Sequence, residues 1–268
     1  MKALVKSFML LILLFTSNGM GSFSFKKMPK KLTAYYSASI QPLEELQEKL
    51  NDNNFTILSI TEVLKEKIVI TITNKELKST NSYMATLQLL VNYEDHEIRI
   101  QNPSYLGAAY LKQEYYYGKF KQTLNSLEDV LGTMSEVKER YTFNALSTFQ
   151  FMYGLPFFKD TLIIEAEENP FIRVTESPHI AYTLELPNGS ILVGHKFKMK
   201  SNNFLKVIHE EKNAQLFPYE SMIQDGEVTI LDPKYYLTLS LPLLNLERFL
   251  KIATAPDTIK REISKAYK

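Results

Sequence analysis

Apolar and polar residues follow two patterns along the chain, and together they predict an α+β protein. From 68 to 73, isoleucine alternates with valine or threonine, which is typical of a β-strand. Leu43, Leu46 and Leu50 instead have the spacing of one helix face, with Pro42 at the start. Further strands are expected at 32–39, 55–63, 87–93, 97–101, 161–165, 171–175, 182–186, 190–197, 219–223 and 227–231, and further helices from Ser126 onward, at 204–211 and from Thr254 to the end.

Short turn sequences join several of these strands into antiparallel hairpins. Asn188 and Gly189 stand between two apolar runs, and both residue types tolerate the positive φ angles of a tight hairpin. The segments 94–96 and 224–226 occupy the same place between two other pairs of strands. We therefore expect mainly antiparallel sheets, each with helices packed on one face.

Two segments of the chain repeat the same order of motifs. Residues 97–105 align with 227–235, and each segment runs from a strand into an Asx-Pro pair and a tyrosine. The Asx side chain bonds to nearby backbone and the proline lacks a ladder donor, so Asn102 and Asp232 each predict the end of a strand. The sequence thus predicts two related α+β units, 32–150 and a divergent 155–268, with the boundary between about 145 and 160.

The same repeated segments resemble the domain-of-unknown-function family 302. The resemblance lies in residues 86–95 and 98–106, and again in 217–219, 226–233 and the terminal helix after Pro256. That family's hairpin typically ends in an Asn-Asp-Pro-like turn, whereas here each copy has only one Asx residue before the proline. The resemblance implies a small α+β domain, often paired with a second copy. It implies no established activity and therefore supplies no catalytic residues.

The N-terminal segment has the pattern of a bacterial signal peptide. Lys2 and Lys6 precede an apolar run at 7–15, which is too short to span a bilayer, and small residues follow it up to Ser24. We expect residues 1–24 to be a signal peptide and the mature protein to be periplasmic or secreted. Four lysines between 26 and 31 resist translocation and leave an alternative, an uncleaved inner-membrane anchor with the rest of the chain facing the periplasm.

Composition excludes several classes of function. The chain of 268 residues contains no Cys, which rules out disulfides, thiolate metal sites and thiol catalysis. The formal net charge of +1 gives no indication of a nucleic-acid partner. Apolar residues make up 45% of the chain, enough to form a core without disulfides or metals.

No motif predicts a catalytic or metal site, and we expect neither catalytic residues nor a cofactor. His96, His179, His195 and His209 have no metal-ligand spacing among them. Adjacent acidic pairs such as 210–211 are typical of solvated faces or caps, and Gly-x-Ser-x-Gly and phosphate-binding loops are absent from the sequence. A site that forms only in three dimensions from His195, His209 and a carboxylate remains an alternative.

Tyrosines gather after the first Asx-Pro pair. Five tyrosines lie between 105 and 117, with lysines among them, and two more follow Asp232. Tyrosine combines a rigid apolar ring with a polar tip, which suits a ligand or a protein interface, although such rings also fill the seam between helix and sheet. The candidate binding residues are Asn102, Tyr105, Tyr110, Tyr116, Asp232 and Tyr235.

The sequence thus favours an exported, non-enzymatic binding or interaction protein with a small ligand or protein partner and no nucleic acid. One alternative is an enzyme or metal-dependent activity built from scattered His and acidic residues. Another is a purely structural role, in which the two units pack together in place of a homodimer. The oligomeric state is not predicted.

Overall fold

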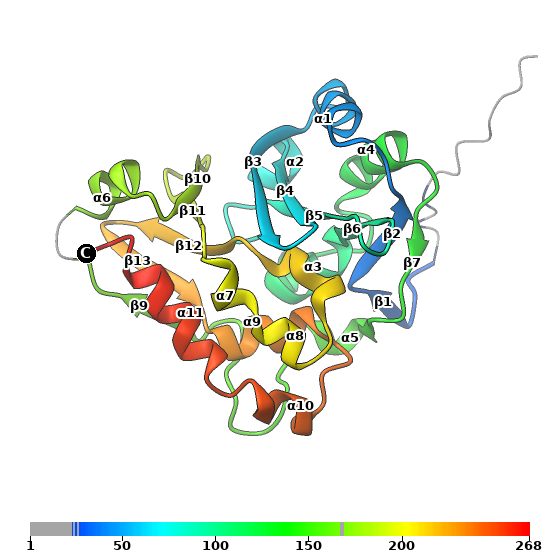
Figure 1. Ribbon diagram of the computed structural model, residues 1–268. Coiled ribbons are helices and arrows are strands. Elements are labelled where there is room, and N and C mark those ends of the chain that lie inside the picture. Colours follow the sequence, from blue (N-terminus) through cyan, green and yellow to red (C-terminus); the bar gives the residue numbers. More distant parts are fainter. Residues whose placement is uncertain (1–22, 24, 26, 167–168) are drawn as a thin grey trace, which may run out of the picture.

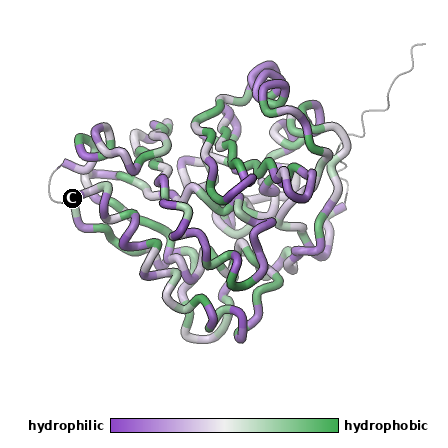
Figure 2. Tube along the Cα trace, in the orientation of Figure 1, coloured by the Kyte–Doolittle hydropathy of each residue, from purple (hydrophilic) through white to green (hydrophobic). Residues whose placement is uncertain are grey.

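The computed structural model describes residues 23, 25, 27–166 and 169–268, and it has the α+β architecture that the sequence predicts. Apart from Phe23, the expected signal peptide 1–24 lies outside the described residues. Two antiparallel sheets lie beside each other, one from each half of the chain, with helices around them (Figure 1). In Figure 2 apolar residues concentrate along the strands, and polar residues predominate on the outlying helix that begins at Leu43.

The first half forms a sheet of six strands and a separate two-stranded sheet. The six strands stand in the order β3-β4-β5-β6-β2-β7, and β1 pairs with β8. The elements are β1 (Lys31–Thr33), β2 (Tyr35–Ser39), α1 (Leu43–Asp52), β3 (Thr56–Leu64), β4 (Lys67–Thr73), α2 (Lys75–Lys78), β5 (Leu87–Asn92), β6 (Glu97–Gln101), α3 (Pro103–Tyr110), the 3-10 helix η1 (Lys112–Glu114), α4 (Lys121–Leu131), β7 (Ser135–Glu136), β8 (Arg140–Thr142) and α5 (Phe143–Leu146).

The second half forms a five-stranded sheet in the order β10-β11-β12-β13-β9. Its elements are β9 (Thr161–Ile164), α6 (Pro170–Glu176), β10 (Ile180–Glu185), β11 (Ile191–His195), α7 (Met199–Asn202), α8 (Phe204–Val207), the 3-10 helix η2 (Glu211–Leu216), β12 (Tyr219–Gln224), β13 (Glu227–Leu231), α9 (Pro233–Ser240), α10 (Leu246–Lys251) and α11 (Ala255–Ser264). None of the helices within the described residues is long and apolar enough to cross a membrane.

The two sheets share one connectivity over five strands. In the first sheet, the five strands follow one another along the chain as β2, β3, β4, β5 and β6. The first of these strands, β2, pairs with the last, β6. The second sheet has the same arrangement, with β9 beside β13 and a helix after the first strand in both halves. Each pattern then continues into an Asx-Pro pair and a helix, α3 or α9.

Both Asx residues of the repeat end a strand, as their motif predicts, and each also caps a helix that was not expected. The Asn102 carboxamide oxygen accepts the Ser104 N–H at 2.9 Å, and the Asp232 carboxylate accepts the Lys234 N–H at 2.8 Å. In each case proline occupies the first turn, where a missing N–H costs nothing. These side chains therefore end a strand and begin a helix.

Equivalent positions of the two halves meet in the centre of the molecule. Gln88 and Glu220, Gln101 and Leu231, and Leu106 and Tyr236 occupy matching places in the two strand–helix patterns, and all six line one small cavity. Like surfaces that meet in this way are typical of a two-fold dimer interface. The 3-10 helix η2 of the second half also contacts β5 and β6 of the first sheet.

Four expected elements differ from the structure, and three of the differences concern helices. Residues 171–175 were expected as a strand but belong to helix α6, because Asn169 accepts the Phe171 N–H and Pro170 starts the helix. Helix α4 begins at Lys121 and not at Ser126. The helix expected at 204–211 ends at Val207, and a positive φ of 52° at His209 separates it from η2.

The strand expected at 32–39 is divided at Ala34. Its N–H donates to the Glu139 carbonyl and its carbonyl accepts the Asn102 N–H. These two hydrogen bonds interrupt the ladder of the strand at Ala34. As a result, β1 pairs with β8, whereas β2 belongs to the six-stranded sheet.

Candidate functional site

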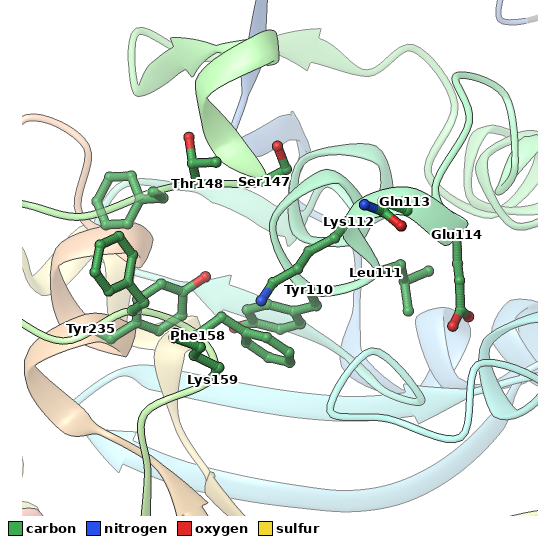
Figure 3. A pocket seen from close by; sticks show the side chains of 12 residues that line it. Tyr110, Leu111, Lys112, Gln113, Glu114, Ser147, Thr148, Phe158, Lys159 and Tyr235 are labelled. Atoms are coloured by element: carbon green, nitrogen blue, oxygen red, sulfur yellow. The ribbon is translucent and has the colours of Figure 1, made fainter.

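An open pocket of about 770 Å³ lies where the end of α3 meets the loops at 147–149 and 157–159. This volume is within the range of small-molecule sites. The exposed side chains of Gln113, Thr148 and Lys159 form part of its rim, so the pocket communicates with solvent. Figure 3 shows its lining, which consists of Tyr110, Leu111, Lys112, Gln113, Glu114, Ser147, Thr148, Phe149, Phe157, Phe158, Lys159 and Tyr235.

Aromatic rings form most of the inner wall of this pocket. Tyr110 stacks on Phe158 with ring centroids 5.0 Å apart and an interplanar angle of 19°. Tyr235 contacts Phe158 at 6.0 Å and meets Phe149 edge to face at 5.8 Å. Tyr110 comes from the first half of the chain and Tyr235 from the second, and the loop that joins the halves supplies both phenylalanines. The wall therefore forms only when the halves are packed together.

The repeated tyrosines Tyr105 and Tyr235 differ in what their hydroxyls contact. Tyr105 donates to the Leu239 carbonyl at 2.8 Å, and Tyr35 donates to the Ser240 carbonyl at 2.6 Å. Both carbonyls lie at the end of α9, where a helix has no internal donors for them. The Tyr235 hydroxyl is buried, and among the described residues it has no hydrogen-bond partner. In Figure 3 it points toward the middle of the pocket.

This difference predicts that the same substitution has different effects on stability at the two matched positions. Tyr105→Phe should lower the free energy of unfolding by about 1–2 kcal/mol, because the buried Leu239 carbonyl loses its donor. Tyr235→Phe should leave the stability within about 0.5 kcal/mol or raise it, because no hydrogen bond is lost. Urea denaturation followed by circular dichroism measures both values. An equal loss in both variants would mean that Tyr235 has a hydrogen-bond partner in the folded protein.

Positive charge predominates around the pocket. Lys112 and Lys159 line it, and among the described residues neither ammonium group is paired with a carboxylate. The Lys112 Nζ lies 5.3 Å from the centroid of the Phe158 ring. Glu114 also lines the pocket, but Figure 3 shows it at the far end from Tyr235. Within the part of the chain that the structure describes, the inner wall therefore faces a cation and no anion.

The other residues predicted to bind lie outside this pocket. Asn102 is fully buried, and its amide group also donates to the Thr33 carbonyl at 2.8 Å, so both ends of the side chain are engaged. Tyr105 is buried against α9, and Asp232 is engaged by its cap. Tyr116 is 65% exposed, beneath the Lys119 ammonium group at 5.7 Å from its ring centroid. Of the six candidates, only Tyr110 and Tyr235 come together.

Much of the tyrosine-rich segment fills a second, separate aromatic cluster. Tyr117 contacts Phe25 at 5.2 Å and Phe143 at 6.4 Å, and Tyr115 contacts Phe120 and Phe143 at 6.3 and 6.0 Å. These rings pack against one another. They contribute no wall to the pocket.

Behind Tyr110 lies a second, inner cavity of about 10 Å³, which is the size of a single water molecule. Tyr110 lines both cavities and so separates them. On the inner side, Thr86 and Tyr182 donate to one carboxylate oxygen of Glu220. Burial raises the pKa of Glu220 to about 7, and the two hydrogen bonds offset this only in part. The inner cavity is too small for an organic ligand.

A buried chain of polar groups joins His195 to the C-terminal segment. The His195 Nε2 lies 2.7 Å from Ser221 Oγ, which lies 2.6 Å from the Tyr267 hydroxyl. All three side chains are at most 1% exposed. Burial lowers the pKa of His195 to about 3, with a smaller effect of His179 in the same direction, so the imidazole is neutral at physiological pH. A serine–histidine contact that is enclosed in this way has no access to a substrate.

The structure does not bring His195 and His209 together with acidic residues at a metal-binding site. Across the described residues, no group of three or more His, Cys, Asp or Glu side chains is arranged to hold a metal ion. His195 lies on β11, whereas His209 follows α8 at a positive φ.

Sequence reasoning missed Lys112, Phe149 and Phe158 as pocket residues. Phe149 and Phe158 lie in the irregular segment between the halves, where no periodic pattern indicates which side chains point inward. One signal was available for Lys112, since the lysines among the tyrosines include it. Its φ of 49°, which is uncommon for a residue other than glycine, could not be read from the sequence.

Comparison with protein-family models, with curated proteins and with solved structures finds no match for this chain. The resemblance to family 302 therefore stays a prediction that rests on the two repeated segments alone.

Proposed function

We propose that this protein is a non-enzymatic binding protein that holds a small organic molecule in the pocket between its two halves. The observation that carries the proposal is the buried, unpartnered Tyr235 hydroxyl in an open, ring-lined pocket of about 770 Å³. A buried polar group without a partner costs about 1–3 kcal/mol, and a ligand that bonds to it removes this cost. Ligand sites are typically apolar pockets that contain a small number of convergent polar groups.

The enzyme alternative has less support from the geometry. A nucleophile with an adjacent base must reach a bound substrate, but the His195–Ser221 pair is enclosed at the centre of the second half. Among the described residues, the pocket lining contains Ser147 and Thr148 but no histidine, and Glu114 is its sole carboxylate. These side chains can orient a ligand by hydrogen bonding without carrying out acid–base chemistry on it.

The structural alternative is supported by the extensive contacts between the halves. Tyr35 and Tyr105 of the first half hold the end of α9, and Tyr83 donates to the Thr229 carbonyl at 2.9 Å. This role explains the interface but not the open pocket beside it. Export to the periplasm, or attachment to the inner membrane with the chain facing the periplasm, belongs to our proposal on the strength of the N-terminal pattern alone.

Blocking the pocket is expected to abolish binding of a small neutral probe. Thr148 is exposed at the rim, so a tryptophan there can cover the opening without disturbing the core. We expect the wild type to bind naphthylmethanol, as measured by saturation-transfer NMR, and Thr148→Trp to lose at least about 80% of the signal.

Tyr153→Trp is the matched control, since Tyr153 is fully exposed and does not line the pocket. This variant should bind the probe like the wild type. Equal signals from Thr148→Trp and the wild type would place the probe elsewhere and contradict the proposal. A wild type that binds no neutral, anionic or cationic aromatic probe would also contradict it.

A further inference from the structure

We infer that the ligand of this pocket is a flat aromatic anion of the carboxylate class, whose ring lies against Phe158 and Tyr235 and whose carboxylate is held by Lys112 and the Tyr235 hydroxyl. This inference rests on the proposed function and adds to it the chemical class of the ligand. Three separate features of the pocket support it: the shape of the aromatic wall, the sign of its charge and the unpartnered hydroxyl.

The aromatic wall suits a planar ring. Tyr110 and Phe158 are stacked within 19° of parallel, and Tyr235 is tilted by 59° to Phe158, so the rings present both flat faces and edges. A flat aromatic ligand can stack on one face and meet another ring at its edge, which are the two favoured arrangements of aromatic pairs. The side chains of Tyr110 and Tyr235 are also buried, with exposed fractions of 5% and 2%. The wall is therefore rigid and needs little ordering when a ligand binds.

The charge of the pocket favours an anion over a cation. Boxes of aromatic rings can hold cationic ligands, so the rings alone would allow either sign. Here, however, the Lys112 ammonium group already lies 5.3 Å from the Phe158 ring centroid, and Lys159 lies on the same rim. A second cation would be repelled by both lysines. An anion would instead pair with ammonium groups that have no carboxylate partner among the described residues.

The backbone at Lys112 holds this charge over the pocket. Its φ of 49° lies in the left-handed region, which costs about 1 kcal/mol or more for a residue with a side chain. The strained residue lies where α3 ends and η1 begins, and Figure 3 shows its side chain extending toward the aromatic wall. Strained residues of this kind cluster at ligand-binding sites.

The Tyr235 hydroxyl supplies a donor for an anionic oxygen. Its equivalent in the first half, Tyr105, donates to a carbonyl, so the same side chain in the same motif normally finds an acceptor. At Tyr235 the acceptor is missing among the described residues, and the hydroxyl points into the pocket (Figure 3). A carboxylate accepts several hydrogen bonds at once and can engage both this hydroxyl and the Lys112 ammonium group.

Three naphthalene derivatives that differ only in one substituent test the class of ligand. These are the anion naphthoate, the neutral naphthylmethanol and the cation naphthylmethylamine, titrated at neutral pH by isothermal calorimetry. We expect naphthoate to bind about tenfold more tightly than the alcohol, and the amine to bind more weakly than either. Added NaCl should weaken the binding of naphthoate more than that of the alcohol.

Two variants locate the interaction. Lys112→Met keeps the apolar stem and should reduce the affinity for naphthoate to about that for the alcohol. Lys119→Met, with a lysine outside the pocket, should leave it unchanged. Tyr235→Phe should weaken naphthoate about fivefold while the protein stays as stable as the wild type, a combination that a purely structural role of Tyr235 would not produce.

The possible outcomes separate this inference from the proposed function. Tightest binding of the amine, or equal binding of all three probes, would overturn the assignment of an anionic ligand while a small-molecule site remained. Unchanged preference for naphthoate in Lys112→Met would also overturn it. Failure of all three probes to bind the wild type would contradict the proposed function as well.

Discussion

Replacing Arg99 with methionine is expected to lower the free energy of unfolding by about 3–5 kcal/mol. Arg99 lies on β6 with 4% of its surface exposed, and its guanidinium contacts the Glu139 carboxylate at 3.2 Å and the Asn213 side chain at 2.9 Å. It also lies 5.5 Å from the centroid of the Tyr35 ring. Asn213 belongs to η2, so this one side chain joins the first sheet to the second half.

Most of this loss in the free energy of unfolding arises because the Glu139 carboxylate stays buried after its partner Arg99 is removed. Burial raises the pKa of Glu139, but Lys212 at 2.9 Å and Arg99 more than offset this, so its pKa lies below the ordinary value. Without Arg99, the buried carboxylate keeps Lys212 as its one cationic partner among the described residues. The double variant Arg99→Met, Glu139→Leu should therefore recover a large part of the loss.

Arg140→Met is the matched control, because the ion pair of Arg140 with Glu136 is exposed at 45% and 50%. It should change the free energy of unfolding by less than about 1 kcal/mol. Chemical denaturation measures all four proteins. A loss in Arg99→Met no larger than that in Arg140→Met would contradict the role of Arg99 in joining the halves.

Acid is expected to destabilise the protein through His195 by up to about 4–5 kcal/mol between pH 6.5 and pH 3. Burial lowers the folded-state pKa of His195 to about 3 from an ordinary value of 6.5. Between these values the unfolded chain binds a proton that the folded protein does not. Stability is therefore fully present above about pH 6.5 and is lost as the pH falls.

Comparison with His195→Leu isolates this effect. The contribution of Glu220 to stability has the opposite dependence on pH. Its pKa is raised to about 7, so its contribution is lost as the pH rises from 4.5. Both proteins contain Glu220, so the difference between their curves should change by about 1.4 kcal/mol per pH unit below pH 6. The exposed His96 serves as control, and His96→Asn should match the wild type. Parallel curves for the wild type and His195→Leu would contradict a neutral, buried His195.

The sequence predicted the α+β class because hairpin turns and strand periodicity are local signals. The Asx-Pro pairs at Asn102 and Asp232 were interpreted correctly as the ends of strands, because this effect depends only on residues within the same turn, but the helices that they cap, α3 and α9, were not expected. The same motif at Asn169 was overlooked in favour of the apolar run behind it, and a helix was mistaken for a strand. The division of the first strand at Ala34 could not be predicted, because it depends on bonds to Glu139 and Asn102.

The candidate site was predicted only in part. Tyr110 was a candidate because it lies in the tyrosine-rich segment after the first Asx-Pro pair, and Tyr235 because it follows the second pair; both line the pocket. Nothing local distinguishes Tyr105, whose hydroxyl has an acceptor, from Tyr235, whose hydroxyl has none. The distinction arises from the packing of α3 against α9, which is a long-range property of the fold.

A crystal structure of the protein with naphthoate tests the central claim most directly. We predict that the naphthalene ring lies against Phe158 and Tyr235, with its carboxylate within hydrogen-bond reach of the Tyr235 hydroxyl and the Lys112 ammonium group. Naphthoate bound away from this pocket, or a pocket that holds none of it at saturating concentration, would contradict the account.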